Sequence, residues 1–242
     1  MGLILGIDTS ATPVSCGVIR DGKVLASFYS HTGLTHSQTL MTMVENTLSV
    51  ANVGVGDLDA LAVNVGPGSF TGVRIGVSAV KGLAFAQNIP CVGVSTLEAM
   101  AESFAGAPVT GDVVCVMDAR CQQVYTATFA LDDEGKLTRL TEDEAISLEE
   151  LKKRRKICKK NTIFVGDGAE MCYNRFLEDR IPASLASVSV RYQNAVGTAL
   201  VAERLLAEGK AVDAEALLPA YLRLPQAERE LKARQAQSGE KK

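Results

Sequence analysis

Tryptophan is absent from this 242-residue sequence, aromatic residues make up 5% of it, and histidine occurs only twice. Single-stranded nucleic acid is usually bound on aromatic side chains, so this composition argues against a base-stacking platform. The two histidines, His31 and His36, cannot form the H-E-x-x-H pair of a zinc-binding helix. The sequence therefore predicts no metal site.

Paired cysteines and long apolar runs are missing as well. None of the six cysteines forms a C-x-x-C pair, the spacing of many structural zinc sites. No apolar run approaches the roughly 20 residues of a membrane span, and the short apolar start lacks the basic lead of a signal peptide. We therefore expect a cytoplasmic protein, without membrane contact, whose cysteines are reduced and mostly fill its core.

Charge is balanced rather than one-sided. The formal net charge is −3, so the field of the whole protein does not attract nucleic acid or anionic lipid. The one basic cluster, residues 152–160, could contact RNA phosphates, but Glu149 and Glu150 precede Lys153 and Arg154 by four residues. Because that order favours ion pairs along a helix, a solvated helix face is the preferred interpretation.

Hydrophobic periodicity predicts the same order of elements twice along the chain. Strands are expected at residues 3–7, 14–20, 24–29, 60–65 and 91–94, with helices at 35–50, 75–87 and 96–104. After a seam at 106–112, strands are expected at 113–117, 124–129, 137–140, 162–165 and 186–190, with helices at 147–159, from 169, and at 195–208. This repeat indicates an α/β fold of two linked halves.

The most informative stretch is the glycine-rich run from Gly66 to Gly76, between a predicted strand and a predicted helix. Such a turn exposes backbone N–H groups at a helix N-terminus, which favours phosphates. A candidate nucleotide site therefore consists of Asp8, Thr9, Ser10, Gly66, Gly68, Gly166 and Gly168. Plain turns are the preferred interpretation at Asp8 and at Gly166–Gly168, and the run from Gly66 to Gly76 is interpreted mainly as support for a partner-binding helix, with any nucleotide site vestigial. The turn at 118–123, which would hold a second phosphate, has no glycine, and Arg120 within it is expected at the surface.

The helix expected after the glycine run is rich in small residues, namely Gly76, Ser78, Ala79, Gly82, Ala84 and Ala86. Glycine inside a helix costs about 1 kcal/mol relative to alanine, so close packing against this helix should compensate for it. The packing surface could be the protein's own sheet or the helix of a partner.

These motifs together resemble the TsaB (YeaZ) family over nearly the whole chain. The similarity runs from residues 3–10 through 65–76 and 93–98 to 221–228. The resemblance implies the actin/Hsp70/sugar-kinase (ASKHA) fold, an α/β architecture of two RNase H-like halves with mixed sheets flanked by helices. With the seam, it gives a partner-binding half at residues 1–106 and a second half at 107–226, and the Lys, Arg, Glu and Gln content of 227–242 predicts a disordered tail.

The resemblance also implies a non-catalytic role in making threonylcarbamoyladenosine in bacterial tRNA. TsaD, a related catalytic protein, carries a histidine pair at positions that match Thr96 and Met100, and neither of these suits a catalytic metal. In the family, TsaB supports TsaD, the ATPase TsaE joins the pair, and TsaC supplies threonylcarbamoyl-adenylate. We expect no catalytic residues and no cofactor, apart from weak ATP or ADP binding in the assembled complex, and tRNA contact only through that complex.

The partner surface implied by the resemblance lies on helices of the first half. Its expected residues are His36, Leu40, Met43, Val44, Thr47, Arg74, Val77, Ser78 and Lys81. Without TsaD, the same faces would pair two copies of the chain in an isologous homodimer. Replacing Ala79 with arginine should leave the monomer folded if its face is a partner surface, and should prevent folding if the face is internal core.

Two other functions stay open. An ATP-dependent phosphotransferase on the actin-like scaffold would hold the nucleotide with Asp8, the Gly66 loop and Gly166–Gly168. A metallopeptidase of the M22 type would need a metal site, and the sequence shows none.

Overall fold

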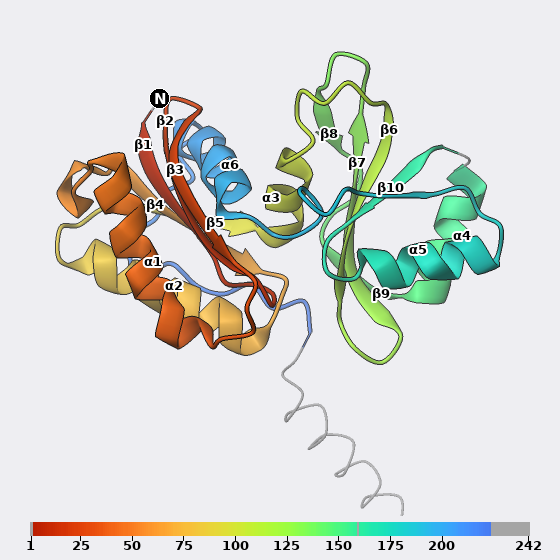
Figure 1. Ribbon diagram of the computed structural model, residues 1–242, viewed down its shortest axis with the longest axis horizontal. Helices are drawn as coiled ribbons and strands as arrows, with labels where there is room; N and C mark the ends of the chain where they lie inside the picture. The colour runs from red at the N-terminus through yellow and green to blue at the C-terminus, as the bar shows by residue number, and fades with distance from the viewer. Residues whose placement is uncertain (1, 159, 224–242) are drawn as a thin grey trace, which may run out of the picture.

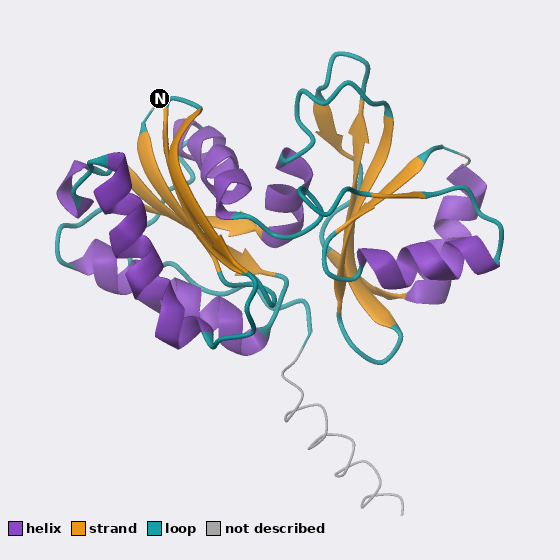
Figure 2. Ribbon diagram, viewed as in Figure 1, coloured by secondary structure: helices purple, strands orange, loops and turns teal. Residues whose placement is uncertain are grey.

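The computed structural model describes residues 2–158 and 160–223 (Figure 1). These residues form two halves that lie side by side, each built on a mixed sheet with helices on both faces (Figure 2). The tail expected to be disordered at 227–242 lies outside the described residues. Within the described part of the chain, no helix is long and apolar enough to cross a membrane.

The first sheet has five strands in the order β3-β2-β1-β4-β5. They are β1 (Leu3–Asp8), β2 (Val14–Arg20), β3 (Lys23–Ser30), β4 (Ala60–Gly66) and β5 (Cys91–Ser95). β1 to β3 form an antiparallel meander, while β4 pairs parallel with both β1 and β5. Because helices cover both faces of the central β1, its sequence is a continuous apolar run rather than an alternating one.

Helices from both ends of the chain cover this sheet. α1 (His36–Ala51) and α2 (Phe70–Phe85) pack on one face, and a 3-10 turn, η1 (Val55–Asp57), follows α1. The last described helix, α6 (Ala195–Ala207), packs on the opposite face (Figure 1). The C-terminal part of the sequence thus completes the first half.

The second sheet repeats the plan in the order β11-β10-β6-β7-β8, and β9 also pairs with β7. Its strands are β6 (Gly111–Asp118), β7 (Gln123–Leu131), β8 (Leu137–Arg139), β9 (Glu144–Ser147), β10 (Thr162–Val165) and β11 (Ser184–Leu185). Its helices are α4 (Leu148–Cys158) and α5 (Ala169–Glu178) on one face and α3 (Thr96–Glu102) on the other. α3 and α6 pack against each other between the two sheets.

This repeated order confirms the predicted α/β fold of two RNase H-like halves, the architecture of actin, Hsp70 and the sugar kinases. Three details of the prediction were wrong. α2 begins at Phe70 rather than at 75, because Ser69 Oγ caps it by accepting a hydrogen bond from the Gly72 N–H. The strand expected at 186–190 does not form: the nearest strand, β11, ends at Leu185, and a turn closed by the Val190 N–H and the Ser187 carbonyl follows it. The sequence does not predict β9, whose residues are half-buried or exposed and show no apolar pattern.

Candidate functional site

A cleft of about 460 Å³ opens between the two halves. The first half contributes residues 10–12 and 67–71, and the second half contributes 117–120, Tyr125 and Asp167. Residues 220–223, which follow α6, complete the lining. This is the place where the sequence predicts a nucleotide site.

The glycine run packs against the protein's own chain. A Cβ at Gly68 would overlap the Ser10 carbonyl oxygen, and a Cβ at Gly72 would overlap that of Thr9. Thr9 Oγ1 donates to the Gly72 carbonyl at 2.7 Å, and the Ser69 N–H donates to the Ser10 carbonyl, also at 2.7 Å. The space that these glycines leave open is therefore filled by the turn after β1.

Asp8, at the end of β1, is buried with only 1% of its surface exposed. Its Oδ1 accepts hydrogen bonds from Ser10 N at 2.8 Å and from Ser10 Oγ at 2.6 Å. Oδ2 has no hydrogen-bond partner among the described residues. Burial raises the pKa of this carboxyl, although Ser10, Asn64 and His36 oppose the rise. Asp8 thus points into the protein and is not part of the cleft lining.

The predicted nucleotide-binding residues are only partly brought together. Of the seven, Ser10 and Gly68 line the cleft. Gly166 and Gly168 pack closely against the backbone at the end of β6 instead. Asp167, which stands between these two glycines, does line the cleft, and its Oδ1 accepts from Gln193 Nε2 at 3.0 Å. The sequence could have indicated Asp167 from its place in the glycine turn.

Two arginines and two aspartates give the cleft a mixed charge. Arg120, with 82% of its side chain exposed, lies 3.5 Å from Asp118 across its own turn, as expected for a surface arginine. Arg223 Nη1 donates to the Ala119 carbonyl. Nothing in the sequence pattern signals Arg223 as a cleft residue, because it comes from a segment more than a hundred positions away.

Four of the nine residues expected at a partner interface are buried, which corrects that part of the prediction. They are Leu40, Val44, Thr47 and Val77. The three apolar ones pack in the core of the first half, and Thr47 Oγ1 donates to the Met43 carbonyl at 2.7 Å. These four side chains support α1 and α2 from within, so they present no surface to a partner.

The other five expected interface residues differ in what they contact. His36 is half-buried, with Nε2 2.7 Å from the Ala11 carbonyl oxygen, and Met43 packs at the edge of the core. Arg74 and Lys81 bond to the C-terminal residues Tyr221 and Glu215, and Ser78 is exposed. Their role at an interface stays a prediction.

The small residues of α2 divide between two faces. Gly72, Gly76 and Ala84 are buried, and a Cβ at Gly76 would overlap Thr9 Oγ1. Gly82 is exposed, and apart from its neighbours and the backbone of its own helix, no atom of the described residues lies within 4 Å of a Cβ built there. Phe85 follows on the same side of the helix with 82% of its surface exposed. The protein's own chain therefore explains part of this composition but leaves Gly82 and Phe85 unexplained.

Thr96 and Met100, at the positions of the TsaD histidine pair, are buried in α3. Met100 packs in the core of the second half. In the described ranges, 2–158 and 160–223, no three His, Cys, Asp or Glu side chains gather into a group that could hold a metal.

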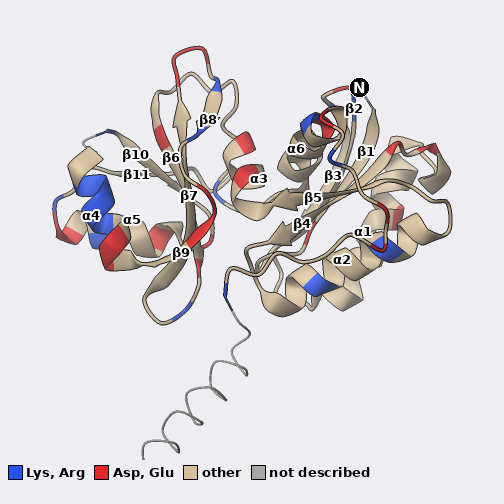
Figure 3. Ribbon diagram, turned by 180° about the vertical axis from the view of Figure 1, so that it is seen from behind, with Lys and Arg blue, Asp and Glu red and all other residues tan. Residues whose placement is uncertain are grey.

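The basic helix α4 is largely paired with acidic neighbours (Figure 3). Lys152 Nζ lies 2.7 Å from both Glu149 and Asp179, and Arg154 bridges Glu144 and Glu150. These pairs confirm an ion-paired helix face. Arg155 of the same cluster is buried instead, where its Nη1 donates to Asp112 Oδ2 at 2.8 Å, so the prediction of a solvated face is wrong for this residue.

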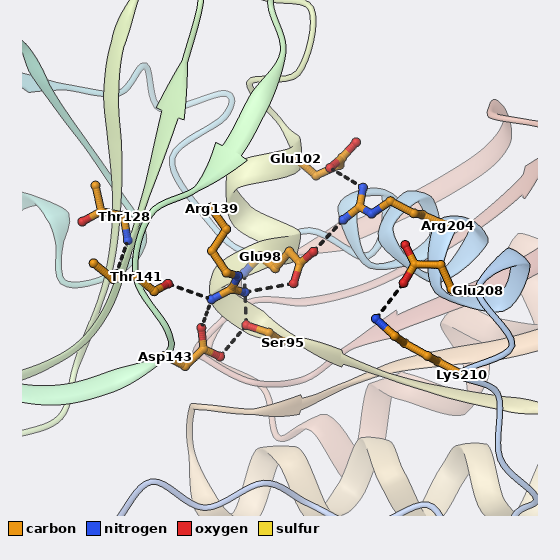
Figure 4. Close-up of polar contacts among 10 residues, drawn as sticks. All are labelled: Ser95, Glu98, Glu102, Thr128, Arg139, Thr141, Asp143, Arg204, Glu208 and Lys210. Carbon is orange, nitrogen blue, oxygen red and sulfur yellow. Dashed lines mark hydrogen bonds and ion pairs between the residues drawn. The ribbon is translucent and has the colours of Figure 1, made fainter.

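A polar network joins the halves around Glu98 of α3 (Figure 4). Arg139, at the end of β8, donates to Glu98 at 2.9 Å and to Asp143 at 2.8 Å. On its other side, Glu98 accepts from Arg204 of α6. Ser95 Oγ also donates to Asp143. This network, here named the Glu98 network, connects the second sheet to the two helices that pack between the sheets.

Known proteins resemble more than nine-tenths of the chain. A family model described as TsaD, tRNA N6-adenosine threonylcarbamoyltransferase, matches residues 30–231. The tRNA threonylcarbamoyladenosine biosynthesis protein TsaB of Escherichia coli is 34% identical over 221 residues, which cover 91% of this chain and 94% of that protein. The protein of the same name from Bacillus subtilis is 31% identical over 225 residues, with 93% and 96% covered.

A solved structure agrees with these relationships. YeaZ from Pseudomonas aeruginosa is 30% identical and superposes with a TM-score of 0.76, covering 92% of this chain and 100% of that one. Sequence and structure thus match the same group of proteins over almost the full length. The chain belongs to the TsaB (YeaZ) family, within the wider group that the TsaD model describes.

Proposed function

We propose that this chain is a non-catalytic subunit required for making threonylcarbamoyladenosine in tRNA, and that it binds and activates a TsaD-type catalytic protein. Its relatives in E. coli and B. subtilis are named for the biosynthesis of this nucleoside. The cleft supports a role without catalysis, because Asp8 is buried and the glycine run packs against the turn after β1.

The observation that carries the proposal is the exposed side of α2. Gly82 weakens the helix by about 1 kcal/mol relative to alanine, and no packing within the described monomer requires it. Beside it, Phe85 exposes a large apolar surface that would be better buried in a complex. A partner helix that packs against Gly82 could approach closely, because no side chain stands there, and it would bury the ring of Phe85.

The proposal extends to the rest of the machinery. A TsaE-type ATPase would join the pair, a TsaC-type protein would supply threonylcarbamoyl-adenylate, and tRNA would be bound through the complex. In the absence of TsaD, the same side of α2 would pair two copies of this chain as an isologous dimer. The chain would need no cofactor of its own, and weak ATP or ADP binding would belong to the assembled complex.

Size-exclusion chromatography with light scattering tests the proposal. The chain alone and mixed with the TsaD homologue of the same cell would be compared, and a one-to-one complex is expected. Ser78→Arg, on the exposed side of α2, should prevent that complex while leaving the circular dichroism spectrum unchanged. Glu134→Arg, on an exposed turn of the second half, is the matched control and should bind normally. A wild-type mixture that elutes as separate proteins would refute the proposal.

A phosphotransferase is the second candidate, because the cleft carries Arg120 and Arg223 in a space of about 460 Å³. Calorimetry of the isolated chain with ATP and Mg²⁺ separates the two functions. Tight binding with turnover would favour the phosphotransferase, whereas we expect weak binding or none. Stoichiometric zinc or iron in the purified protein would favour a metallopeptidase instead.

A further inference from the structure

The C-terminal residues 213–223, here named the strap, run along the first half to the cleft. Leu217 is buried in the core of that half, with 2% of its surface exposed. The Ala220 N–H donates to the Val65 carbonyl at 2.8 Å. A Cβ at Gly66 would overlap the Ala220 carbonyl oxygen, so this glycine makes room for the strap. The strap is thus a fixed part of the first half up to residue 220.

Beyond that point, side chains from α2 hold the strap. The ring of Tyr221 stacks on Phe70 with 4.8 Å between centroids. Arg74 Nε donates to the Tyr221 hydroxyl at 2.8 Å, and its guanidinium lies 3.9 Å from the centre of the Phe70 ring. Arg74 is exposed on α2, one turn before Ser78. A residue on the proposed partner surface therefore positions the end of the strap.

Two residues later, the strap reaches the other half. Arg223 Nη1 donates to the carbonyl oxygen of Ala119, in the turn between β6 and β7. The next three residues of that turn, Arg120, Cys121 and Gln122, all have left-handed backbone conformations, with φ of 63°, 54° and 57°. Non-glycine residues adopt this conformation only at a cost, so the turn depends on its hydrogen bonds to keep its shape.

The Glu98 network ties the halves together at the other end of their interface. In Figure 1, β8, where Arg139 lies, and the point where the strap leaves the described structure are at opposite ends of the boundary between the halves. At the β8 end, Ser95 of β5 bonds to Asp143 and Arg204 of α6 pairs with Glu98 and Glu102 of α3, whereas Arg223 spans the cleft with a single hydrogen bond. The Arg223–Ala119 bond is the weaker of these contacts, so the cleft opens when this bond breaks.

We propose that the strap is a relay that couples the exposed side of α2 to the opening of the cleft. Arg74 fixes Tyr221, and Tyr221 places Arg223 against Ala119. A protein that binds α2 at Arg74 changes the contact between Arg74 and Tyr221. It therefore changes the stability of the Arg223–Ala119 hydrogen bond and of the closed cleft. Because such coupling is reciprocal, a change in the opening of the cleft alters affinity at α2 by the same factor. Only the identity of that protein rests on the proposed function.

Hydrogen exchange of the isolated full chain, followed by mass spectrometry of peptides spanning residues 117–124, tests the relay. Arg223→Ala removes the bond across the cleft and should speed exchange there by about three- to tenfold, the effect of losing one hydrogen bond. Tyr221→Phe keeps the stacked ring but removes the hydroxyl, and Arg74→Ala removes the donor. Both substitutions should speed hydrogen exchange at the same backbone amides, although the bonds that they remove lie outside that turn. Ser78→Ala, one turn along α2, should leave them unchanged.

The outcomes separate the parts of the proposal. If Arg223→Ala has no effect, the strap does not hold the cleft. If Arg223→Ala speeds exchange but Tyr221→Phe and Arg74→Ala do not, the relay is wrong. Exchange in β1 and β4 must stay unchanged in all variants, which shows that the fold is intact. Adding the TsaD homologue should alter exchange at 117–124 in the wild type but not in Arg223→Ala. Failure of the two proteins to bind would count against the proposed function alone.

Discussion

At the scale of single residues, the six cysteines differ most in burial. All six thiols are free, and Cys16, Cys91, Cys115 and Cys172 are buried whereas Cys121 and Cys158 are exposed. Burial raises the pKa of Cys16 and of Cys172 to about 12 each, with a smaller contribution from nearby carboxylates. Since the thiolate is the reactive form, these buried thiols are inert at neutral pH. The expected role of cysteines as core residues is confirmed for four of the six.

Thiol titration should therefore separate the cysteines into two groups. With an aromatic disulfide reagent at neutral pH, the native protein should react rapidly at two positions, and the denatured protein at six. Replacing Cys121 and Cys158 with serine should abolish the rapid phase without changing the melting temperature. A third rapidly reacting thiol would show that one of the buried positions is accessible in solution.

The buried carboxylate of Asp8 lowers the stability of the folded protein, and this gives a second prediction at the residue scale. Because its pKa is raised in the folded protein, the folded state binds this proton more readily than the unfolded state. The cost is present when the carboxyl is ionised and is lost as the pH falls through the raised pKa toward the ordinary value. Asp8→Asn, which keeps the acceptor for Ser10, should therefore raise the free energy of unfolding at pH 7, measured in urea.

The pH dependence distinguishes this cause from a general packing effect. The advantage of Asp8→Asn over the wild type should shrink as the pH falls through the raised pKa of Asp8 toward the ordinary value of 3.8. Asp8→Ala is the control, because it leaves both donors of Ser10 without their acceptor and should destabilise the protein. An advantage that stayed constant with pH would mean that ionisation of Asp8 is not its source.

At the scale of elements, α2 has two faces with opposite demands on small residues. Gly76→Ala would place a methyl group on Thr9 Oγ1, whereas Gly82→Ala would place one in open space. We expect Gly82→Ala to stabilise the isolated chain by about 0.5–1 kcal/mol through helix propensity, and Gly76→Ala to destabilise it. Thermal unfolding of the two variants measures this difference.

The same pair of variants reports on the partner surface. If a partner helix packs across Gly82, then Gly82→Ala should weaken complex formation even though it stabilises the monomer. Ala79→Arg is a poorer probe, because Ala79 is half-buried against the core of the first half. Stabilisation of the monomer with unchanged binding would place the interface elsewhere.

At the scale of the whole molecule, the Glu98 network holds the two sheets in one arrangement. Arg139→Met removes a guanidinium that bonds Glu98 and Asp143, both of which are largely shielded from water. We expect a loss of roughly 2–3 kcal/mol in the free energy of unfolding. Arg175→Met, which also removes bonds to two carboxylates but at an exposed site, should cost under about 1 kcal/mol. Equal losses for the two variants would show that shielding from water does not strengthen the ion pairs of the network.

Local sequence signals account for much of the fold but less of the site. Periodicity and turn residues predict nearly every element, because helix and strand formation depends on neighbours in the sequence. Apolar spacing also identifies the inner side of α1, but it cannot say whether that side meets a sheet or a partner. The resemblance implies a partner surface on α1 and α2, and Leu40, Val44 and Val77 on these helices are therefore predicted at an interface although they lie in the core.

The sequence by itself determined the order of the elements, the two-half α/β plan and the strand–turn–helix unit at Gly66–Gly76. Only the tertiary structure decided what fills the space beside those glycines, since Thr9 bonds to Gly72 across 63 positions of sequence. It also brought Asp167, Tyr221 and Arg223 to one cleft. The physical reason is that burial and hydrogen-bond partners are set by segments far apart in the chain, and a local pattern carries no record of them.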